Sequence, residues 1–157
     1  IQPTDGARNS GVKRKHNANR ALVEGKRIIL IDDSIVRGTT SLKIIEMMRD
    51  AGAAEVHMRI ASPPTSHSCF YGVDTPERSK LLAANMDIAA MAAFIQADSL
   101  AFVSIDGLYR AVGQAGRDKR NPQFCDACFT GEYPPRLTDL TERETPDLLT
   151  LPVHTAA

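Results

Sequence analysis

The chain has 157 residues, of which 43% are hydrophobic and 24% are charged, with 19 Lys and Arg side chains against 19 Asp and Glu. This balance excludes a chain disordered by excess charge, and it argues against a general nucleic-acid binder, which usually carries a broad basic excess. The length predicts one globular domain with a substantial core. Since the sequence contains neither an 18-residue apolar run nor the apolar core of a signal peptide, we expect a cytoplasmic protein without a membrane partner.

The first 25 residues are polar and basic, and they include the run Lys13-Arg14-Lys15. Their composition predicts a flexible basic loop that leads into structure. The sequence begins at Ile1, without Met, in a stretch that opens no recognisable element. We therefore expect a longer protein upstream.

The next segments predict a strand, a helix and a second strand. The continuous apolar run of residues 28–31 is typical of a strand buried on both faces of a parallel sheet. Apolar residues at helical spacing follow Gly38-Thr39-Thr40, and Gly52 stands where a C-cap glycine belongs. Alternating apolar residues predict a half-buried strand over residues 55–61.

The same alternation of strands and helices continues in the second half of the chain. The predictions are a helix opened by Thr75-Pro76 and running through Leu82, an Ala-rich helix capped by Asp87 and ending near Ile95, a strand over residues 100–105, and a helix capped by Asp106. This alternation indicates an α/β fold with an open parallel sheet and right-handed crossovers.

Asp32 and Asp33 open a loop at the carboxyl end of the first predicted strand, where doubly wound sheets bind ligands. Backbone N–H groups that enter a helix N-terminus attract anions. The loop adds the residue types of a phosphate cradle, namely Ser34, Arg37, Gly38, Thr39 and Thr40. Two adjacent carboxylates would repel a bare phosphate, so we interpret them as acceptors for sugar hydroxyls or as neighbours of Mg²⁺. A ribose phosphate satisfies both the acid pair and the phosphate cradle. The alternative is that the acids are solvated and that the hydroxyls cap the helix.

This combination of strand, paired acids and Gly-Thr-Thr resembles the signature of the type I phosphoribosyltransferases. Further segments are similar, in order, to the amidophosphoribosyltransferases, the glutamine-dependent enzymes that open de novo purine (IMP) synthesis: Ile31 to Thr40, Ala61 to Pro64, Phe70 to Asp74, Ala97 to Leu100 and Cys128 to Pro134. The resemblance implies a Rossmann-like type I phosphoribosyltransferase fold. It makes residues 1–135 the C-terminal portion of that domain, with residues 1–25 as its flexible basic loop and lead-in, and residues 136–157 a C-terminal tail.

The resemblance also implies roles for the loop residues. Asp32 and Asp33 would hold the ribose hydroxyls of 5-phosphoribosyl 1-diphosphate (PRPP) near Mg²⁺, and the loop from Ser34 to Thr40 would cradle its 5-phosphate. Ammonia from glutamine would displace pyrophosphate to give 5-phosphoribosylamine. The basic loop would close over PRPP, with Arg14 and Lys15 as the catalytic contacts to the diphosphate, and a solvated basic stretch is the alternative.

Cys125 and Cys128 form a Cys-x-x-Cys motif, and Cys69 lies upstream. The motif alone is compatible with redox chemistry, a metal site or neither. Some members of the resembled family hold a [4Fe–4S] cluster on four cysteines, and these three match three of them, which places the fourth ligand before Ile1. Other members lack the cluster, so buried thiols are the alternative.

The resemblance further implies parts that this sequence does not contain. The family hydrolyses glutamine with an N-terminal cysteine in a separate amidohydrolase domain, which we expect to precede Ile1 together with part of the early sheet. We therefore expect a fragment that cannot use glutamine by itself and that leaves a sheet edge or core face uncovered. A homo-oligomer inhibited by purine nucleotides is also expected.

Two departures and two alternatives accompany this interpretation. His16 stands where relatives more often have an apolar residue, and Gln96 stands where they often have Gly. One alternative is a purine salvage transferase that also uses PRPP, with a base-recognition loop near residues 102–109. The other is a non-catalytic regulator of the same fold that binds a nucleotide.

Overall fold

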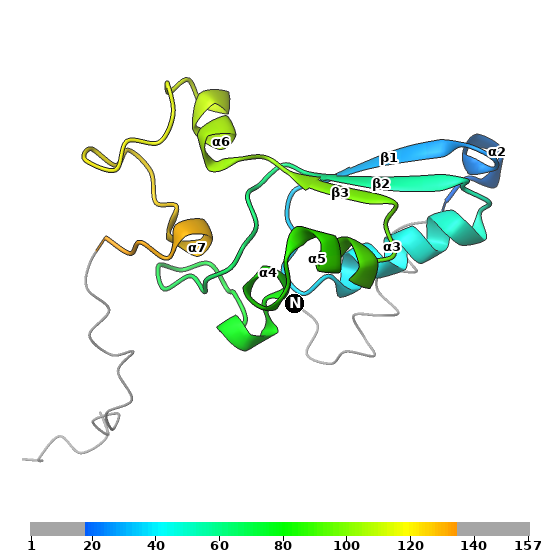
Figure 1. Cartoon of the computed structure of the whole chain (residues 1–157), viewed down its shortest axis with the longest axis horizontal. Coiled ribbons are helices and arrows are strands. Elements are labelled where there is room, and N and C mark those ends of the chain that lie inside the picture. The colour runs from blue at the N-terminus through cyan, green and yellow to red at the C-terminus, as the bar shows by residue number, and fades with distance from the viewer. Residues whose placement is uncertain (1–17, 135–157) are drawn as a thin grey trace, which may run out of the picture.

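The computed structural model describes residues 18–134 (Figure 1). Arg14 and Lys15, the rest of the predicted basic loop up to residue 17, and the predicted tail 136–157 lie outside the described residues. The helices and strands, in chain order, are α2 (Arg20–Val23), β1 (Arg27–Asp32), α3 (Thr39–Asp50), β2 (Glu55–Ile60), the 3-10 turn η1 (Arg78–Lys80), α4 (Leu82–Asn85), α5 (Ile88–Phe94), β3 (Ser99–Phe102), α6 (Ile105–Ala111) and α7 (Ala127–Thr130).

The three described strands form a parallel sheet in the order β1-β2-β3. Asp32 at the end of β1 pairs with Ile60 at the end of β2, and Ile60 pairs with Phe102 at the end of β3. The three carboxyl ends therefore lie side by side at one edge of the sheet. Figure 1 shows α3, α4 and α5 on one face of the sheet, which confirms the predicted α/β fold with parallel strands.

The core fills the space between the sheet and these helices. Val56, Met58 and Ile60 alternate inward from β2, and each is at most 2% exposed. They pack in one cluster with Ile45 of α3 and Met91 of α5. Each such side chain stabilises the fold by about 1.5–3 kcal/mol when it is removed from water.

The prediction that the first strand is buried on both faces is wrong. Ile29 is 64% exposed and Ile31 is 78% exposed, whereas Ile28 and Leu30 are half-buried. Side chains alternate between the two faces of a strand, and the described helices α3 to α5 cover one face only. An apolar run identifies a strand, but it does not show that both faces are covered within this chain. The expectation of an uncovered sheet face is met by the described residues.

The prediction of one helix from Thr75-Pro76 through Leu82 is also wrong. The structure has the short turn η1 and then α4, separated by an extended Leu81. This break lets both Leu81 and Leu82 enter the core, where they are 0% and 6% exposed. The backbone N–H of Leu82 also donates to the carbonyl of Val36 at 2.8 Å, which an uninterrupted helix would prevent.

The third strand is shorter than predicted, and the helix after it has a different cap. β3 ends at Phe102, and Ser104 rather than Asp106 caps α6 by accepting from the Gly107 N–H at 3.0 Å. Ile105 is already helical, so Asp106 lies in the first turn of α6. Its carboxylate instead accepts from the Arg117 N–H at 2.9 Å.

Two other predicted helices, α3 and α5, are confirmed, and the carboxylate of Asp98 links α3 to the sheet. α3 ends at Asp50 with Gly52 after it, and Asp87 caps α5 by accepting from the Ala90 N–H at 2.8 Å. Asp98, which precedes β3, accepts from the Val56 N–H at 2.6 Å and from Arg49 at 2.5 Å. These hydrogen bonds lower the pKa of Asp98 below its usual value, the Val56 N–H having the largest effect.

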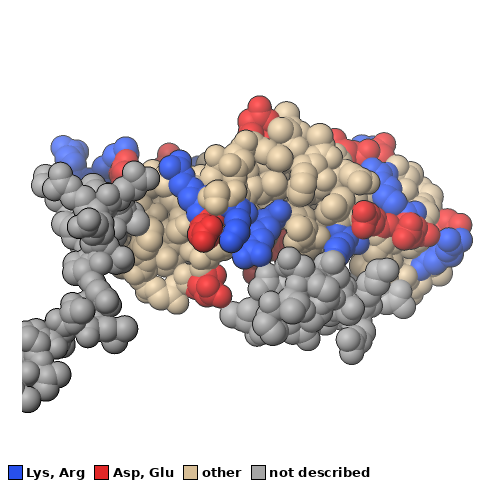
Figure 2. Space-filling view, turned by 90° about the horizontal axis from the view of Figure 1, so that it is seen from below, with Lys and Arg blue, Asp and Glu red and all other residues tan. Residues whose placement is uncertain are grey.

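The surface of the described residues mixes both signs of charge. Figure 2 shows Lys and Arg side chains interspersed with Asp and Glu on the face that it presents. Among residues 18–134, the helices are all too short or too polar to cross a membrane.

Gly38 is required where the loop after β1 enters α3. Its φ of +75° is in the left-handed region, and a Cβ atom there would lie 2.7 Å from Leu82 Cδ2 and 3.0 Å from Phe94 Cε1. Gly25 has a similar φ of +69°, but no atom lies within 4 Å of its Cβ position. Replacing either glycine by a larger residue therefore strains the backbone, but only at Gly38 would the added Cβ atom also clash with its neighbours.

We expect Gly25→Ala to destabilise the chain by about 1 kcal/mol through backbone strain alone. Gly38→Ala adds overpacking, which typically costs about 1–3 kcal/mol more. Urea unfolding of both variants checks this difference. Equal destabilisation by the two substitutions would contradict the close packing of Gly38 against α4 and α5.

Gln96, one of the two departures from the family pattern, is the non-glycine residue with a positive φ in the described part, at +60°. It is exposed at the end of α5, so Gln96→Gly relieves backbone strain without removing a buried contact. We expect stabilisation of about 0.5–1 kcal/mol in urea unfolding. Ala89→Gly, at an exposed position inside α5, is the control and should destabilise by about 1 kcal/mol. Destabilisation by Gln96→Gly would show that the side chain matters more than the strain.

Candidate functional site

A cavity of about 440 Å³ lies beyond the carboxyl end of β1. Its walls include every residue from Asp32 to Ser41, and therefore all seven residues that the sequence predicts for PRPP: Asp32, Asp33, Ser34, Arg37, Gly38, Thr39 and Thr40. The structure thus gathers the predicted acids, hydroxyls and glycine around one space. Asp74 and Pro76 close the cavity from a different part of the chain.

The two carboxylates are held by short-range hydrogen bonds at the strand end. Asp32 is half-buried and its Oδ1 accepts from the Asp33 N–H at 3.0 Å. Asp33 is exposed and its Oδ1 accepts from the Ser34 hydroxyl at 3.1 Å. Each carboxylate keeps further acceptor capacity, because an ionised carboxylate has about four lone-pair sites. The pair can therefore accept hydroxyl donors from a ligand.

The loop between the acids and α3 is fixed from both sides. Ile35 is 2% exposed and anchors the loop in the core, and the carbonyl of Val36 accepts from Leu82 of α4. The first hydrogen bond of α3 runs from the Leu42 N–H to the Gly38 carbonyl at 2.9 Å. The N–H groups of the first turn consequently have no partner inside the helix, and they lie beside the exposed Thr39 and Thr40. This end of the cavity suits an anion.

Asp74 and Pro76 were not predicted as lining residues. They belong to the segment after Pro63-Pro64, and hydrogen bonds at its base give it a defined shape. The Cys69 N–H donates to Thr75 Oγ1 at 2.7 Å, and the Ser68 hydroxyl donates to the Pro76 carbonyl at 2.9 Å. The signal in the sequence was the position of this segment after β2, because the carboxyl ends of adjacent parallel strands share one edge.

The three cysteines come from two distant segments that are hydrogen-bonded to each other. Cys69 is half-buried and its Sγ accepts from the Tyr71 N–H at 3.3 Å. Cys125 is exposed and Cys128 is half-buried. The Cys128 carbonyl accepts from the N–H groups of Ser66 at 3.1 Å and His67 at 3.0 Å, which joins α7 to the Cys69 segment.

Burial raises the pKa of the Cys128 thiol, and the nearby Cys125 and Cys69 raise it further. In the described part, no three His, Cys, Asp or Glu side chains are placed to hold a single metal ion. A [4Fe–4S] cluster takes four thiolates, each on a different iron, so the chemistry of these three thiols fits three of its ligands.

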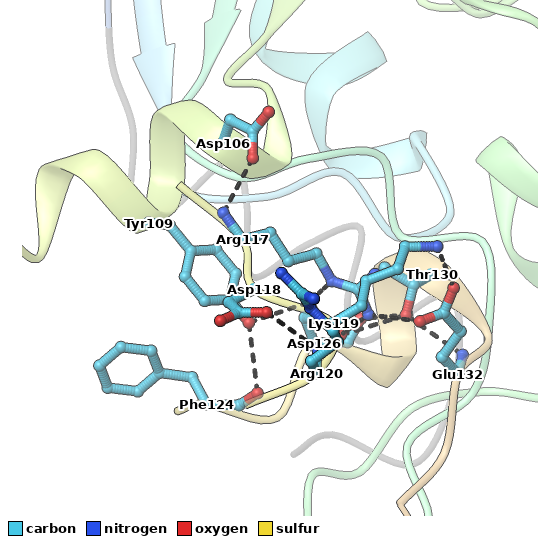
Figure 3. Close-up of polar contacts among 10 residues, drawn as sticks. All are labelled: Asp106, Tyr109, Arg117, Asp118, Lys119, Arg120, Phe124, Asp126, Thr130 and Glu132. Atoms are coloured by element: carbon cyan, nitrogen blue, oxygen red, sulfur yellow. Dashed lines mark hydrogen bonds and ion pairs between the residues drawn. The ribbon is translucent and has the colours of Figure 1, made fainter. Parts of the chain in front are cut away.

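An ionic network centred on the buried Asp126 holds the Cys-x-x-Cys segment (Figure 3). The Arg117 guanidinium pairs with both carboxylate oxygens of Asp126 and donates to Glu132 at 2.7 Å. The Tyr109 hydroxyl donates to Asp126 Oδ2 at 3.0 Å, and Lys119 donates to Glu132 at 2.7 Å. Sequence reasoning missed this network, since Arg117 belongs to no recognisable motif and Asp126 occupies one of the two unspecified positions of Cys-x-x-Cys.

The network determines the charge state of its buried carboxylate. Burial acts to raise the pKa of Asp126, but the hydrogen bonds from Arg117 and Tyr109 outweigh it and lower that pKa below its usual value. Hydrogen bonds to Asp126 and Glu132 raise the pKa of Arg117. Both groups therefore remain charged at neutral pH, as a paired buried ion requires.

Comparison with known proteins agrees with these features. No family model matches the chain. It is 61% identical over 140 residues to an amidophosphoribosyltransferase of Rhizobium etli, covering 88% of this chain and 28% of that protein. It is 49% identical over 144 residues to the chloroplastic amidophosphoribosyltransferase 3 of Arabidopsis thaliana, covering 92% of this chain and 26% of that protein.

Solved structures give the same result. The glutamine PRPP amidotransferase of Bacillus subtilis, solved with ADP and GMP, matches with a TM-score of 0.71 and 48% identity, over 85% of this chain and 29% of that one. This likeness confirms the type I phosphoribosyltransferase fold. The chain spans between a quarter and a third of the length of these three relatives. Within that span, it belongs to the amidophosphoribosyltransferase family.

Proposed function

We propose that this chain supplies the PRPP-binding part of a glutamine-dependent amidophosphoribosyltransferase. The observation that carries the proposal is the cavity at the end of β1, which is lined both by paired carboxylates and by the N-terminal turn of a helix. This juxtaposition matches a ribose with hydroxyls at one end and a phosphate at the other. The family relationship supports the same substrate.

Different side chains of the cavity bind different parts of PRPP. Asp32 and Asp33 accept hydrogen bonds from the ribose hydroxyls, and the loop from Ser34 to Thr40 donates to the 5-phosphate. Mg²⁺ is usually held by one or two carboxylates together with substrate phosphates, so the acid pair fits it, and the ion would neutralise the departing diphosphate. The protein orients C1 for attack by ammonia through an oxocarbenium-like state, which requires no side-chain nucleophile.

The sequence resemblance extends this proposal beyond the described residues. Arg14 and Lys15 would contact the diphosphate when the basic loop covers the site, excluding water that would hydrolyse PRPP. Glutamine would be the source of ammonia, through a domain outside this sequence. Inhibition by purine nucleotides, a homo-oligomer and a cytoplasmic location complete the proposal.

We also propose that Cys69, Cys125 and Cys128 are three ligands of a [4Fe–4S] cluster. The hydrogen bonds that join the segment before Cys69 to α7 support this, and so does the backbone N–H that donates to Cys69 Sγ. The sequence contains three cysteines, so the fourth thiolate has to come from outside it. Because transfer of ammonia to PRPP needs no electrons, the cluster would be structural or oxygen-sensing.

The alternatives remain distinguishable by their ligands. A purine salvage transferase would form product with a free purine base rather than with ammonia, and a regulator would bind a nucleotide without turnover. The similarity to amidophosphoribosyltransferases over 85–92% of the chain favours the first proposal over both.

Calorimetric titration of PRPP into the chain, with and without Mg²⁺, tests the binding site. We expect Mg²⁺-dependent binding that Asp32→Asn or Asp33→Asn weakens by roughly 10- to 100-fold, because a hydrogen bond to a charged group contributes about 1.5–3 kcal/mol. Asp50→Asn, at the exposed end of α3, is the matched control and should leave affinity unchanged. A folded chain, verified by circular dichroism, whose affinity is equally insensitive to all three substitutions would refute the assignment of the acid pair.

The cysteine arrangement predicts an order of alkylation by iodoacetamide in the metal-free chain. The exposed Cys125 should react first and Cys128 last, because burial and neighbouring sulfurs raise the pKa of Cys128 and deplete its thiolate. Timed quenching and peptide mass spectrometry measure this order. Alkylation of Cys128 before Cys125 would contradict the burial of the Cys128 thiol.

A further inference from the structure

We propose that Asp126 is a positioning residue that holds Cys125 and Cys128 in place for the cluster, an inference that rests on the proposed iron–sulfur site. Asp126 lies between the two cysteines and is 6% exposed. Asp side chains are almost never fully buried unless they are paired. The burial of Asp126 calls for a specific set of partners.

The partners of Asp126 occupy both carboxylate oxygens. Oδ2 accepts from the Tyr109 hydroxyl and from Arg117 Nε, while Oδ1 accepts from the second arm of Arg117 at 3.0 Å and from the Thr130 hydroxyl at 3.2 Å. A two-armed pair of this kind fixes orientation as well as position. Figure 3 shows Arg117, Tyr109 and Thr130 converging on this one side chain.

These partners connect the cysteine segment to the rest of the fold. Tyr109 is 4% exposed on α6, the helix that follows β3. Arg117 is tied to the same helix, because its backbone N–H donates to Asp106 at 2.9 Å. Asp126 therefore fastens Cys125 and Cys128 to an element that continues from the sheet.

A second anchor joins the segment to the chain that carries the third cysteine. The Cys128 carbonyl accepts from the backbone N–H groups of Ser66 and His67, which shortly precede Cys69. The side chain of Asp126 and the carbonyl of Cys128 thus hold the segment between α6 and the Cys69 segment. Two fixed points define where its thiols lie relative to Cys69.

The geometry separates this role from simple helix capping. Asp126 occupies the N-cap position of α7, but its side chain makes no capping hydrogen bond to the helix backbone. Its carboxylate is directed instead to Arg117 and Tyr109. The side chain therefore serves the connection to α6.

The test uses the full-length protein that carries this chain, reconstituted anaerobically with iron and sulfide. Asp126→Asn keeps the size of the side chain and removes its charge, and Arg117→Lys keeps the charge and removes the two-armed geometry. Asp118→Asn is the matched control, because this carboxylate of the same loop accepts from the Arg120 N–H and is exposed. The measurements are iron and sulfide content, the rate at which air bleaches the cluster absorbance, the melting temperature of the metal-free protein, and PRPP affinity.

We expect Asp126→Asn to lose at least half of its cluster or to bleach at least threefold faster in air, with Arg117→Lys in between and Asp118→Asn like the wild type. PRPP affinity should stay near its wild-type value, whereas the melting temperature of the metal-free protein falls in Asp126→Asn because the substitution leaves the buried Arg117 without its charge partner. Unchanged content and bleaching in Asp126→Asn overturn the inference. So does a loss of PRPP binding in the same variant, which shows a general structural role. A wild-type protein that binds PRPP but takes up no cluster overturns both this inference and the iron–sulfur proposal, and leaves the PRPP proposal standing.

Discussion

The parallel pairing of β1, β2 and β3 is the constraint on which the candidate sites depend. Parallel strands direct all their carboxyl ends to one edge, so Asp32, Ile60 and Phe102 end in register. The segment after each strand leaves from that edge. The first forms the acidic loop, the second carries Cys69 and Asp74, and the third begins α6 and leads to Arg117. Residues far apart in the sequence meet there because the sheet brings their starting points together.

Much of this arrangement is predictable from local sequence, and the failures have physical causes. The acidic loop is predictable because its residues are contiguous and their chemistry is explicit. The exposure of Ile29 and Ile31 is not, since covering a strand face depends on elements elsewhere. The break at Leu81 is likewise set by tertiary contacts that override the helical pattern of residues 76–82.

Single site residues are likewise either predictable from local sequence or dependent on tertiary contacts. Asp32 and Asp33 are recognisable in the sequence because they are adjacent and follow a strand. Asp74 lines the cavity only because the segment after β2 folds back toward it. The ion pair of Arg117 and Asp126 joins two residues nine positions apart in a stretch without regular structure between α6 and α7. No periodicity marks such a contact, so it is found only in three dimensions.

The loop of residues 69–76 carries both a cysteine and part of the cavity wall. Cys69 is its first residue, Asp74 and Pro76 line the cavity, and two hydrogen bonds close its base. The Cys69 N–H donates to Thr75, which stands between the two lining residues. The same short stretch of backbone therefore sets the position of a thiol and of one wall of the cavity.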